Sequence, residues 1–174
     1  MGMQDVAAAM ERVKSVLERR PDKGLHDDAQ ATATWKGGTR IVASHANGTQ
    51  MATDMPVEFG GTGDQISPGW LFRAGIASCA ATTIAMKAAE RGIELTTLEV
   101  KANSRTDTRG FLRMEQVEGG FVNPGPCDFR LTVRIGANAP AEQLRTLVNE
   151  GLGCAPITTA VAQSNPVAID VEIA

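Results

Sequence analysis

One stretch of the sequence decides the fold: SPGWLFRAGIASCAATTIAMKAAERG, residues 67–92. Ser67 followed by Pro68 is a pair that typically opens an α-helix, because the serine hydroxyl caps a free backbone N–H and proline fits the first turn. Gly92 is the residue type that commonly follows the last helical turn, since glycine adopts the left-handed backbone conformation easily. The stretch therefore predicts a long helix from Pro68 to about Arg91.

The middle of this helix carries small residues on every face, from Ala74 to Ala85. Inside a helix, glycine costs about 1 kcal/mol relative to alanine, so Gly75 needs a compensating reason. Small side chains let neighbouring backbones approach closely on several sides, which predicts a helix buried at the centre of the molecule. Cys79 stands within this run, either as a small buried apolar side chain or as a reactive thiol.

The segments on either side of the helix predict strands. Alternating side chains, together with Gly-Gly and Asn-Gly turns, mark a three-stranded meander before the helix, and alternation marks more strands after it. The predicted strands are residues 29–36, 39–45, 49–56, 95–104, 127–135 and 167–173. Residues 105–126 are rich in glycine, proline and charge and are expected to form a long hairpin.

Helical spacing and proline positions predict the remaining helices. They are residues 4–20, a segment that Pro140 opens and that is interrupted near Gly151, and a short segment that Pro156 starts. The order of elements predicts an α+β fold with a mostly antiparallel sheet. We expect residues 1–25 to be an amphipathic helical extension and residues 26–174 to be a single domain.

Composition excludes several classes of protein. The 174 residues carry a net charge of −3 and no run of more than two basic residues, so nucleic acid is not an expected partner. No apolar stretch is long enough to span a membrane, and the charged N-terminus does not fit a signal peptide, which indicates a cytoplasmic protein. Three cysteines without a CxxC motif predict neither a disulfide framework nor, with the two scattered histidines, a zinc site. No cofactor is expected.

The central stretch resembles the OsmC/Ohr family of thiol peroxidases over roughly residues 29–173. The resemblance rests on Ser67-Pro68, on Leu71 three residues after the proline, and on the alanine-rich run that ends in Cys79. A Gly-Gly loop before the helix, Arg91-Gly92-Ile93 after it and the later CAPITTAV segment also fit. The resemblance implies an intertwined homodimer in which sheets wrap around two long central helices, with the N-terminal helix as an addition.

The resemblance also implies the chemistry. In the family a hydroperoxide, organic or hydrogen peroxide, oxidises the first cysteine, here Cys79, to a sulfenic acid. The second cysteine, here Cys154, condenses with it to a disulfide, and a thiol reductant such as a dithiol or a thioredoxin-like donor restores both thiols. No membrane or nucleic-acid partner is implied.

The thiolate form of a cysteine is the nucleophile, so an activating cation is expected near Cys79. Lowering a thiol pKa from about 8.5 to about 6 requires about 3.4 kcal/mol, and one guanidinium at about 4 Å supplies about 4 kcal/mol at an effective dielectric constant of 20. The family takes this arginine from the strand region after a Gly-Gly turn, which points to Arg40 after Gly37-Gly38. Arg40 as an exposed strand residue, and Arg73 as the cation, are the alternatives.

The chain departs from the family pattern at two positions. Peroxide-reducing members carry a glutamate ten residues before the first cysteine, where it holds the arginine; here that position is Gly69, and Glu58 or Asp64 are possible replacements. The family's Cys-Pro motif here reads Cys154-Ala-Pro, which places Cys154 one residue further from the helix that Pro156 starts.

Two functional hypotheses follow. In the first, the protein is a thiol peroxidase with Cys79, Cys154 and Arg40 as its catalytic residues. In the second, it has kept the family fold but lost efficient peroxidase chemistry, and it binds a small apolar ligand or reacts with another electrophile through Cys79. Aromatic side chains line an apolar mouth in the first hypothesis or belong to an ordinary core; they are Phe59, Trp70, Phe72, Phe111 and Phe121. Cys127 starts a strand and is interpreted as structural.

Overall fold

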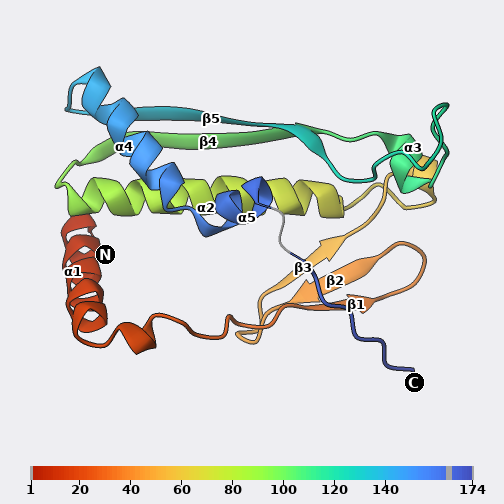
Figure 1. Ribbon diagram of the computed structural model, residues 1–174, viewed down its shortest axis with the longest axis horizontal. Helices are drawn as coiled ribbons and strands as arrows, with labels where there is room; N and C mark the ends of the chain where they lie inside the picture. Colours follow the sequence, from red (N-terminus) through yellow and green to blue (C-terminus); the bar gives the residue numbers. More distant parts are fainter. Residues whose placement is uncertain (1, 164–165, 174) are drawn as a thin grey trace. The chain divides into compact units, whose positions relative to one another are not determined.

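The computed structural model describes residues 2–163 and 166–173 and has the predicted α+β architecture (Figure 1). The chain divides into two compact parts, which are described separately. The β1–β3 part comprises Ala8–Gly75, and the β4–β5 part comprises Met1–Ala7 together with Ile76–Ala174.

The β1–β3 part is built on an antiparallel meander in the order β1-β2-β3. Its strands are β1 (Thr32–Trp35), β2 (Ile41–Ser44) and β3 (Gln50–Thr53). Most of α1 (Met3–Arg19) and η1 (Pro21–Lys23) precede them in the chain. The short η2 (Val57–Phe59) and the first turns of α2 (Pro68–Glu90) follow them. Both predicted turns are confirmed. Lys36 N–H donates to the carbonyl of Arg40 across Gly37-Gly38, and His45 N–H donates to the carbonyl of Thr49 across Asn47-Gly48, both over 2.9 Å.

The β4–β5 part combines the rest of α2 with a two-stranded antiparallel sheet of β4 (Leu95–Arg105) and β5 (Cys127–Ala137). The helices α4 (Ala141–Gly153) and α5 (Pro156–Ala162) follow β5, and the short α3 (Thr108–Phe111) lies between the two strands in the chain. Figure 1 shows β4 and β5 running along α2, with α4 crossing the same helix. The core cluster contains Ala88, Ile93 and Leu147, and partly buried apolar residues, Met3 and Leu95 among them, pack against it.

The ends of α2 confirm the signals in the sequence. Trp70 N–H donates to Ser67 Oγ over 3.2 Å at the start. At the end, Gly92 has a φ of 65°, and Ile93 N–H donates to the carbonyl of Ala88 over 2.9 Å. These contacts form the left-handed cap that glycine favours.

Within the single chain, the prediction that α2 is buried at the centre of the molecule is confirmed for one face of the helix. One stripe, Ile76, Ala80, Ile84 and Ala88, is buried, whereas Ser78, Thr82 and Met86 are exposed. The buried residues recur every four positions, which is the spacing of a single helix face. Within one chain, therefore, α2 is covered on one side only.

Two details of the sequence-based prediction are wrong, and a third is incomplete. The structure assigns no strand to residues 167–173, where Val167, Ile169, Val171 and Ile173 are all more than three-quarters exposed. Alternation alone does not make a strand, because a strand needs a neighbouring strand to pair with. The region 105–126 contains the predicted hairpin, in which Glu115 bridges Phe121, but also α3, which Asp107 caps by accepting from Arg109 N–H. The helix α4 continues through Gly151 to Gly153 without the predicted interruption.

Candidate functional site

Arg40 lies at the end of the β1–β2 turn, directly before β2. Gly37 and Gly38 both have positive φ, 105° and 55°, and Arg40 N–H donates to the carbonyl of Gly37 over 3.0 Å. Such backbone conformations favour glycine because no Cβ clashes with the preceding carbonyl. The turn therefore fixes the backbone of Arg40, whose side chain is 31% exposed.

Asp54 faces Arg40 across the sheet. The register pairs Ile41 with Thr53, so the next residues outward on β2 and β3 are Arg40 and Asp54. Arg40 Nη2 donates to Asp54 Oδ2 over 3.1 Å, and the Asp54 side chain is only 3% exposed. A carboxylate buried to this extent needs several donors to remain ionised.

Asp54 has those donors. Its Oδ1 accepts from Thr39 Oγ1 over 2.5 Å and from Met55 N–H over 2.8 Å. Its Oδ2 accepts from Thr62 N–H over 3.2 Å and Thr62 Oγ1 over 2.8 Å, in addition to Arg40. Hydrogen bonds from the Thr39 and Thr62 hydroxyls hold the pKa of the Asp54 carboxyl far below its usual range.

A second carboxylate, Asp64, reaches Arg40 from the loop before α2. Arg40 Nη2 donates to Asp64 Oδ1 and also to Thr62 Oγ1, the latter over 2.6 Å. Asp64 is 53% exposed. Hydrogen bonds from Thr62 and Arg40 lower the pKa of Asp64, and those with Asp64 and Asp54 raise the pKa of Arg40. The group of one guanidinium and two carboxylates has a net charge of −1.

The loop that carries Asp64 is packed closely onto the end of β3. Asp54 N–H donates to the carbonyl of Ile66 over 3.0 Å, next to a parallel bridge between Thr53 and Ile66. A Cβ on Gly61 would lie 1.8 Å from the Met55 carbonyl oxygen, so only glycine fits there. This packing brings Thr62 and Asp64 to Arg40.

At Gly69, the position of the family's glutamate, no side chain is present to hold Arg40. A Cβ built there would lie 3.6 Å from Arg73 Nη1, so the Arg73 side chain folds back over Gly69 on its own helix. Of the two replacements considered from the sequence, Asp64 binds Arg40, whereas no ion pair of Glu58 is found among the described residues. Asp54, Thr39 and Thr62 were not predicted as site residues from the sequence. For Asp54, the register of the predicted β2–β3 hairpin was a signal that could have identified it.

Cys79 is a free, half-buried thiol on α2, beside the buried stripe of that helix. The hydroxyl of Thr83, one turn later, donates to the backbone carbonyl of Cys79 over 3.2 Å. On α2 its neighbours toward the exposed side are small, and a Cβ on Gly75 would meet nothing within 4 Å. Cys79 thus lies between the buried stripe of α2 and its exposed residues Ser78 and Thr82.

Cys154 is a free, exposed thiol at the C-terminal end of α4, directly before Ala155, which is the N-cap of α5. Pro156 starts α5, as predicted from the sequence. Close contact fixes the end of α4 on α2, because a Cβ on Gly151 would lie 2.7 Å from Ile84 Cα. Nearby on α2, a hydrogen bond to Glu90 raises the pKa of Lys87.

Both cysteines therefore belong to the same region of the β4–β5 part. Ile84, against which Gly151 packs, follows Cys79 by five residues on α2. Arg40 belongs to the β1–β3 part, and its action on Cys79 remains a prediction, as does a disulfide between Cys79 and Cys154. Cys127 is the exposed first residue of β5.

Four of the five aromatic side chains singled out from the sequence are exposed within one chain, and Phe59 is half-buried. Trp70, Phe72, Phe111 and Phe121 are between 42% and 60% exposed. Among residues 2–163 and 166–173, no group of three or more His, Cys, Asp or Glu side chains could hold a metal ion. In the same residues, no helix is both long and apolar enough to cross a bilayer.

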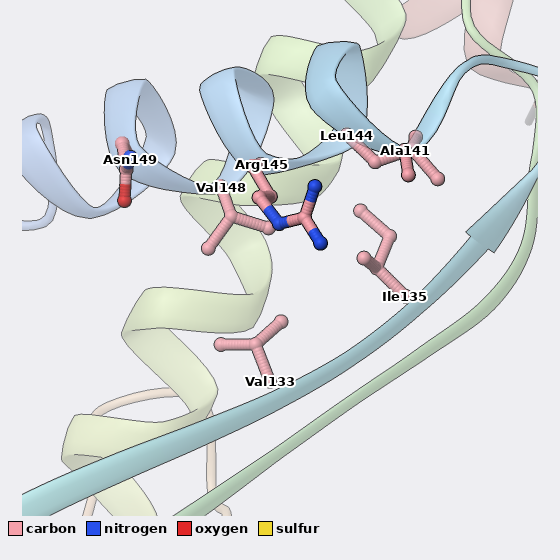
Figure 2. A pocket seen from close by; sticks show the side chains of 7 residues that line it. All are labelled: Val133, Ile135, Ala141, Leu144, Arg145, Val148 and Asn149. Atoms are coloured by element: carbon pink, nitrogen blue, oxygen red, sulfur yellow. The ribbon is translucent and has the colours of Figure 1, made fainter.

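A cavity of about 370 Å³ lies between β5 and α4 (Figure 2). Val133 and Ile135 form its floor on β5, and Leu144, Val148 and other residues of α4 cover it. Figure 2 shows the Arg145 guanidinium between these apolar side chains, with Asn149 at one end. The cavity is lined mainly by apolar side chains, with Arg145 and Asn149 as its polar members.

The model of the family described as OsmC-like protein matches residues 61–170, which include Cys79 and Cys154. No curated protein sequence is significantly similar to the chain.

Solved structures match over most of the chain. An OsmC-like protein from Mycoplasma pneumoniae is similar with a TM-score of 0.66 and 15% identity, over 79% of this chain and 89% of that one. A candidate organic hydroperoxide resistance protein from Vibrio cholerae, with captopril bound in one of its active sites, has a TM-score of 0.53 and 26% identity over 79% and 88%. The organic hydroperoxide resistance protein OhrB of Bacillus subtilis has a TM-score of 0.50 and 24% identity over 78% and 90%.

Proposed function

Because this chain belongs to the family of OsmC-like proteins, we propose that it is a thiol peroxidase that reduces organic hydroperoxides or hydrogen peroxide through Cys79. One observation carries the proposal: Cys79 is a free thiol on α2 within the segment that matches the family. Solved relatives described as organic hydroperoxide resistance proteins, at 24% and 26% identity, support the substrate class.

The reaction has three steps. The Cys79 thiolate attacks the outer peroxide oxygen, so that the O–O bond breaks, an S–O bond forms and the alkoxide leaves as the alcohol after taking a proton. The Cys154 thiol then attacks the sulfenic sulfur, which forms the Cys79–Cys154 disulfide and releases water. Two thiols of an external dithiol, or of a thioredoxin-like donor, reduce this disulfide by exchange and become a disulfide themselves.

Arg40 has the role of activating cation in this proposal. The guanidinium stabilises the Cys79 thiolate and then the negative charge that develops on the leaving oxygen. Its fixed backbone after the Gly-Gly turn and its two carboxylate partners support a positioned, functional side chain rather than a freely exposed one.

The proposal includes a homodimer. The exposed side of α2 with Ser78, Thr82 and Met86, and the exposed alternating residues Val167, Ile169, Val171 and Ile173, are surfaces that a second copy would cover. A cytoplasmic location, where thiol reductants are available, fits the same proposal.

A thiol titration tests the function. Reduced protein is mixed with one equivalent of cumene hydroperoxide, and free thiols and intact mass are followed over time. The proposal expects the loss of two thiols within seconds to minutes and a Cys79–Cys154 link in the peptide map. Thiols that remain reduced for hours would contradict it.

Two variants sharpen the titration. Cys79→Ser should consume no peroxide, whereas Cys154→Ser should still lose the Cys79 thiol once and accumulate the sulfenic acid, which dimedone traps. Cys127→Ser is the matched control, because Cys127 lies on β5 outside the proposed pair and should leave both thiol losses unchanged.

A second function is favoured by two observations: Gly69 stands where the family's glutamate is expected, and an apolar cavity lies between β5 and α4. In this alternative, the protein binds a small apolar ligand or reacts with a different electrophile through Cys79. The titration separates the two functions, because the alternative expects thiols that survive the hydroperoxide and a Val148→Trp variant that loses ligand binding.

A further inference from the structure

We propose that the cavity between β5 and α4 binds a small monocarboxylate with an apolar tail, whose carboxylate pairs with Arg145 and whose tail lies on Val133 and Ile135. The residues that line this cavity all belong to the β4–β5 part, and neither Cys79 nor Cys154 is among them. Such binding does not depend on peroxide reduction and goes beyond the proposed peroxidase. It gives a chemical class to the small ligand of the second function and rests on that function only in this respect.

The apolar surface of the cavity follows from the periodicity of its two elements. On β5, Val133 and Ile135 are half-buried, whereas Arg134 between them is exposed, as the alternation of a strand requires. On α4, Leu144 and Val148 are four residues apart and therefore share one face of the helix. Strand and helix present their apolar sides to the same space of about 370 Å³, which suits a small tail.

Arg145 supplies the one charge among the side chains that line the cavity. Figure 2 shows its guanidinium reaching in between Val148, Ile135 and Val133, over the apolar floor. A guanidinium that lies against apolar side chains is placed to bind the head of a ligand whose tail rests on the same floor.

The existing partner of Arg145 leaves it available. Its Nη1 donates to Glu142 Oε2 over 3.2 Å, and the two side chains are 70% and 83% exposed. An ion pair this exposed contributes little free energy. Because a guanidinium has five N–H donors, its remaining donors can bind a second carboxylate.

Charge and shape select the head group of the ligand. No acidic side chain lines the cavity, so an anion meets Arg145 without repulsion from the lining. The planar fork of a guanidinium matches a carboxylate with two parallel hydrogen bonds. A single cation balances a single negative charge, which favours a monocarboxylate over a phosphate that carries up to about two charges. Asn149 at one end of the cavity offers an amide to a further polar group (Figure 2).

Isothermal titration of the full chain with sodium octanoate tests the site. Octanol is the same chain without the charge, and acetate is the carboxylate without the chain. Octanoate should bind saturably, octanol more weakly, and acetate without detectable saturation over the same concentrations. Hexanoate should bind more weakly than octanoate, since each fully buried methylene strengthens binding by about fourfold. The absence of saturable octanoate binding would overturn the site.

Variants assign the binding to the cavity. Arg145→Met should weaken octanoate binding by about tenfold, the loss expected for one charge-assisted contact, and leave octanol binding unchanged. Val148→Trp fills the cavity and should weaken both. If Val148→Trp does not fold, Ala141→Phe fills the cavity from an exposed position at the start of α4. Arg130→Met, on the exposed face of β5, is the control and should change neither.

The outcomes separate this inference from both functions. Octanoate that binds no tighter than octanol, or equally well to Arg145→Met, overturns the pairing with Arg145 and leaves an apolar-ligand function standing. Cumene hydroperoxide titration with and without octanoate reports on Cys79 independently and should give the same thiol loss. Octanoate that slows this loss, with no effect of Arg145→Met on its binding, would place the ligand at the cysteine and overturn the cavity assignment.

Discussion

At the scale of single residues, Asp54 is the most constrained polar group of the candidate site. Five hydrogen bonds end on its two oxygens, and its side chain is almost fully buried. The same bonds that fix Arg40 therefore also stabilise the fold, and they depend on an ionised carboxylate.

This dependence predicts how stability changes with pH. The folded-state pKa of Asp54 lies below its unfolded value, so its contribution is complete above about pH 4 and is lost as pH falls toward the folded-state pKa. Asp54→Asn should be less stable than the native chain at pH 7, and the gap should shrink toward pH 3. Urea unfolding at both pH values checks this, with Asp28→Asn as the control. A gap that is the same at both pH values would disprove the linkage.

Arg40 carries the second prediction at this scale. If Arg40 lowers a thiol pKa from about 8.5 to about 6, its removal reduces the thiolate fraction at pH 7 by about 30-fold. Arg40→Met should slow the reaction of Cys79 with cumene hydroperoxide by that factor, measured by stopped-flow under single-turnover conditions. Arg40→Lys should fall between the two, because an ammonium keeps the charge without the planar geometry.

Arg73→Met is the matched control for Arg40, because the Arg73 side chain folds over Gly69 on its own helix. Its rate should equal that of the native chain. If Arg73→Met loses as much rate as Arg40→Met, the prediction that Arg40 in particular is the activating cation is contradicted.

At the scale of secondary-structure elements, the contact between α4 and α2 decides where Cys154 lies. Gly151 packs on Ile84 so closely that any side chain would collide with the backbone of α2. This contact fixes the end of α4, and therefore Cys154, at one position along the axis of α2, the helix that carries Cys79.

Gly151→Ala should therefore destabilise the protein and separate the two thiols. Overpacking at a tight contact typically costs about 1–3 kcal/mol, and the displaced α4 should slow disulfide formation after the sulfenic acid has formed. Urea unfolding and the rate of disulfide formation measure the two effects.

Gly153→Ala is the control from the same helix, because a Cβ there meets nothing within 4 Å. It should leave stability unchanged or slightly increased, since alanine favours the helix. Equal destabilisation by both variants would mean that glycine content, rather than the contact with Ile84, matters in α4.

At the scale of the whole molecule, one chain leaves apolar side chains exposed, among them Met86 on α2 and Val167, Ile169, Val171 and Ile173. The uncovered side of α2 and the alternating residues from Val167 to Ile173 are of the kind that subunit association buries. A homodimer that assembles through the two central helices would bury both surfaces.

The dimer is tested by light scattering. The native chain should elute with twice the mass of one chain, and Thr82→Arg, which places a charged side chain on the exposed side of α2, should shift it toward the monomer. Arg134→Glu, a charge change on an exposed position of β5, should leave the mass unchanged. A native chain that is monomeric at micromolar concentration would exclude the dimer.

Much of the architecture could be predicted from the sequence because its signals are local. Ser67-Pro68, Gly92, Gly37-Gly38 and Asn47-Gly48 each act through the backbone of a few neighbouring residues, and all four are confirmed. The α+β class follows from the order of these elements. The family resemblance, carried by the helix around Cys79, is confirmed by the match over residues 61–170.

Other features depended on partners distant in the sequence. Residues 167–173 alternate as a strand does, yet no strand forms there, because pairing requires a neighbour that alternation cannot specify. The uninterrupted end of α4 likewise depends on a distant residue. Gly151 packs closely against Ile84 of α2, and this contact holds Gly151 in the helix.

The central helix shows both sides of this division. By itself the sequence determined the length and ends of α2 and the place of Cys79 within it, because helix caps and small-residue spacing are local properties. Only the tertiary structure decided which carboxylates hold Arg40. Asp54 reaches it through the β2–β3 register and Asp64 through a loop packed on β3, and hydrogen bonds between residues 14 and 24 positions apart leave no local pattern in a sequence.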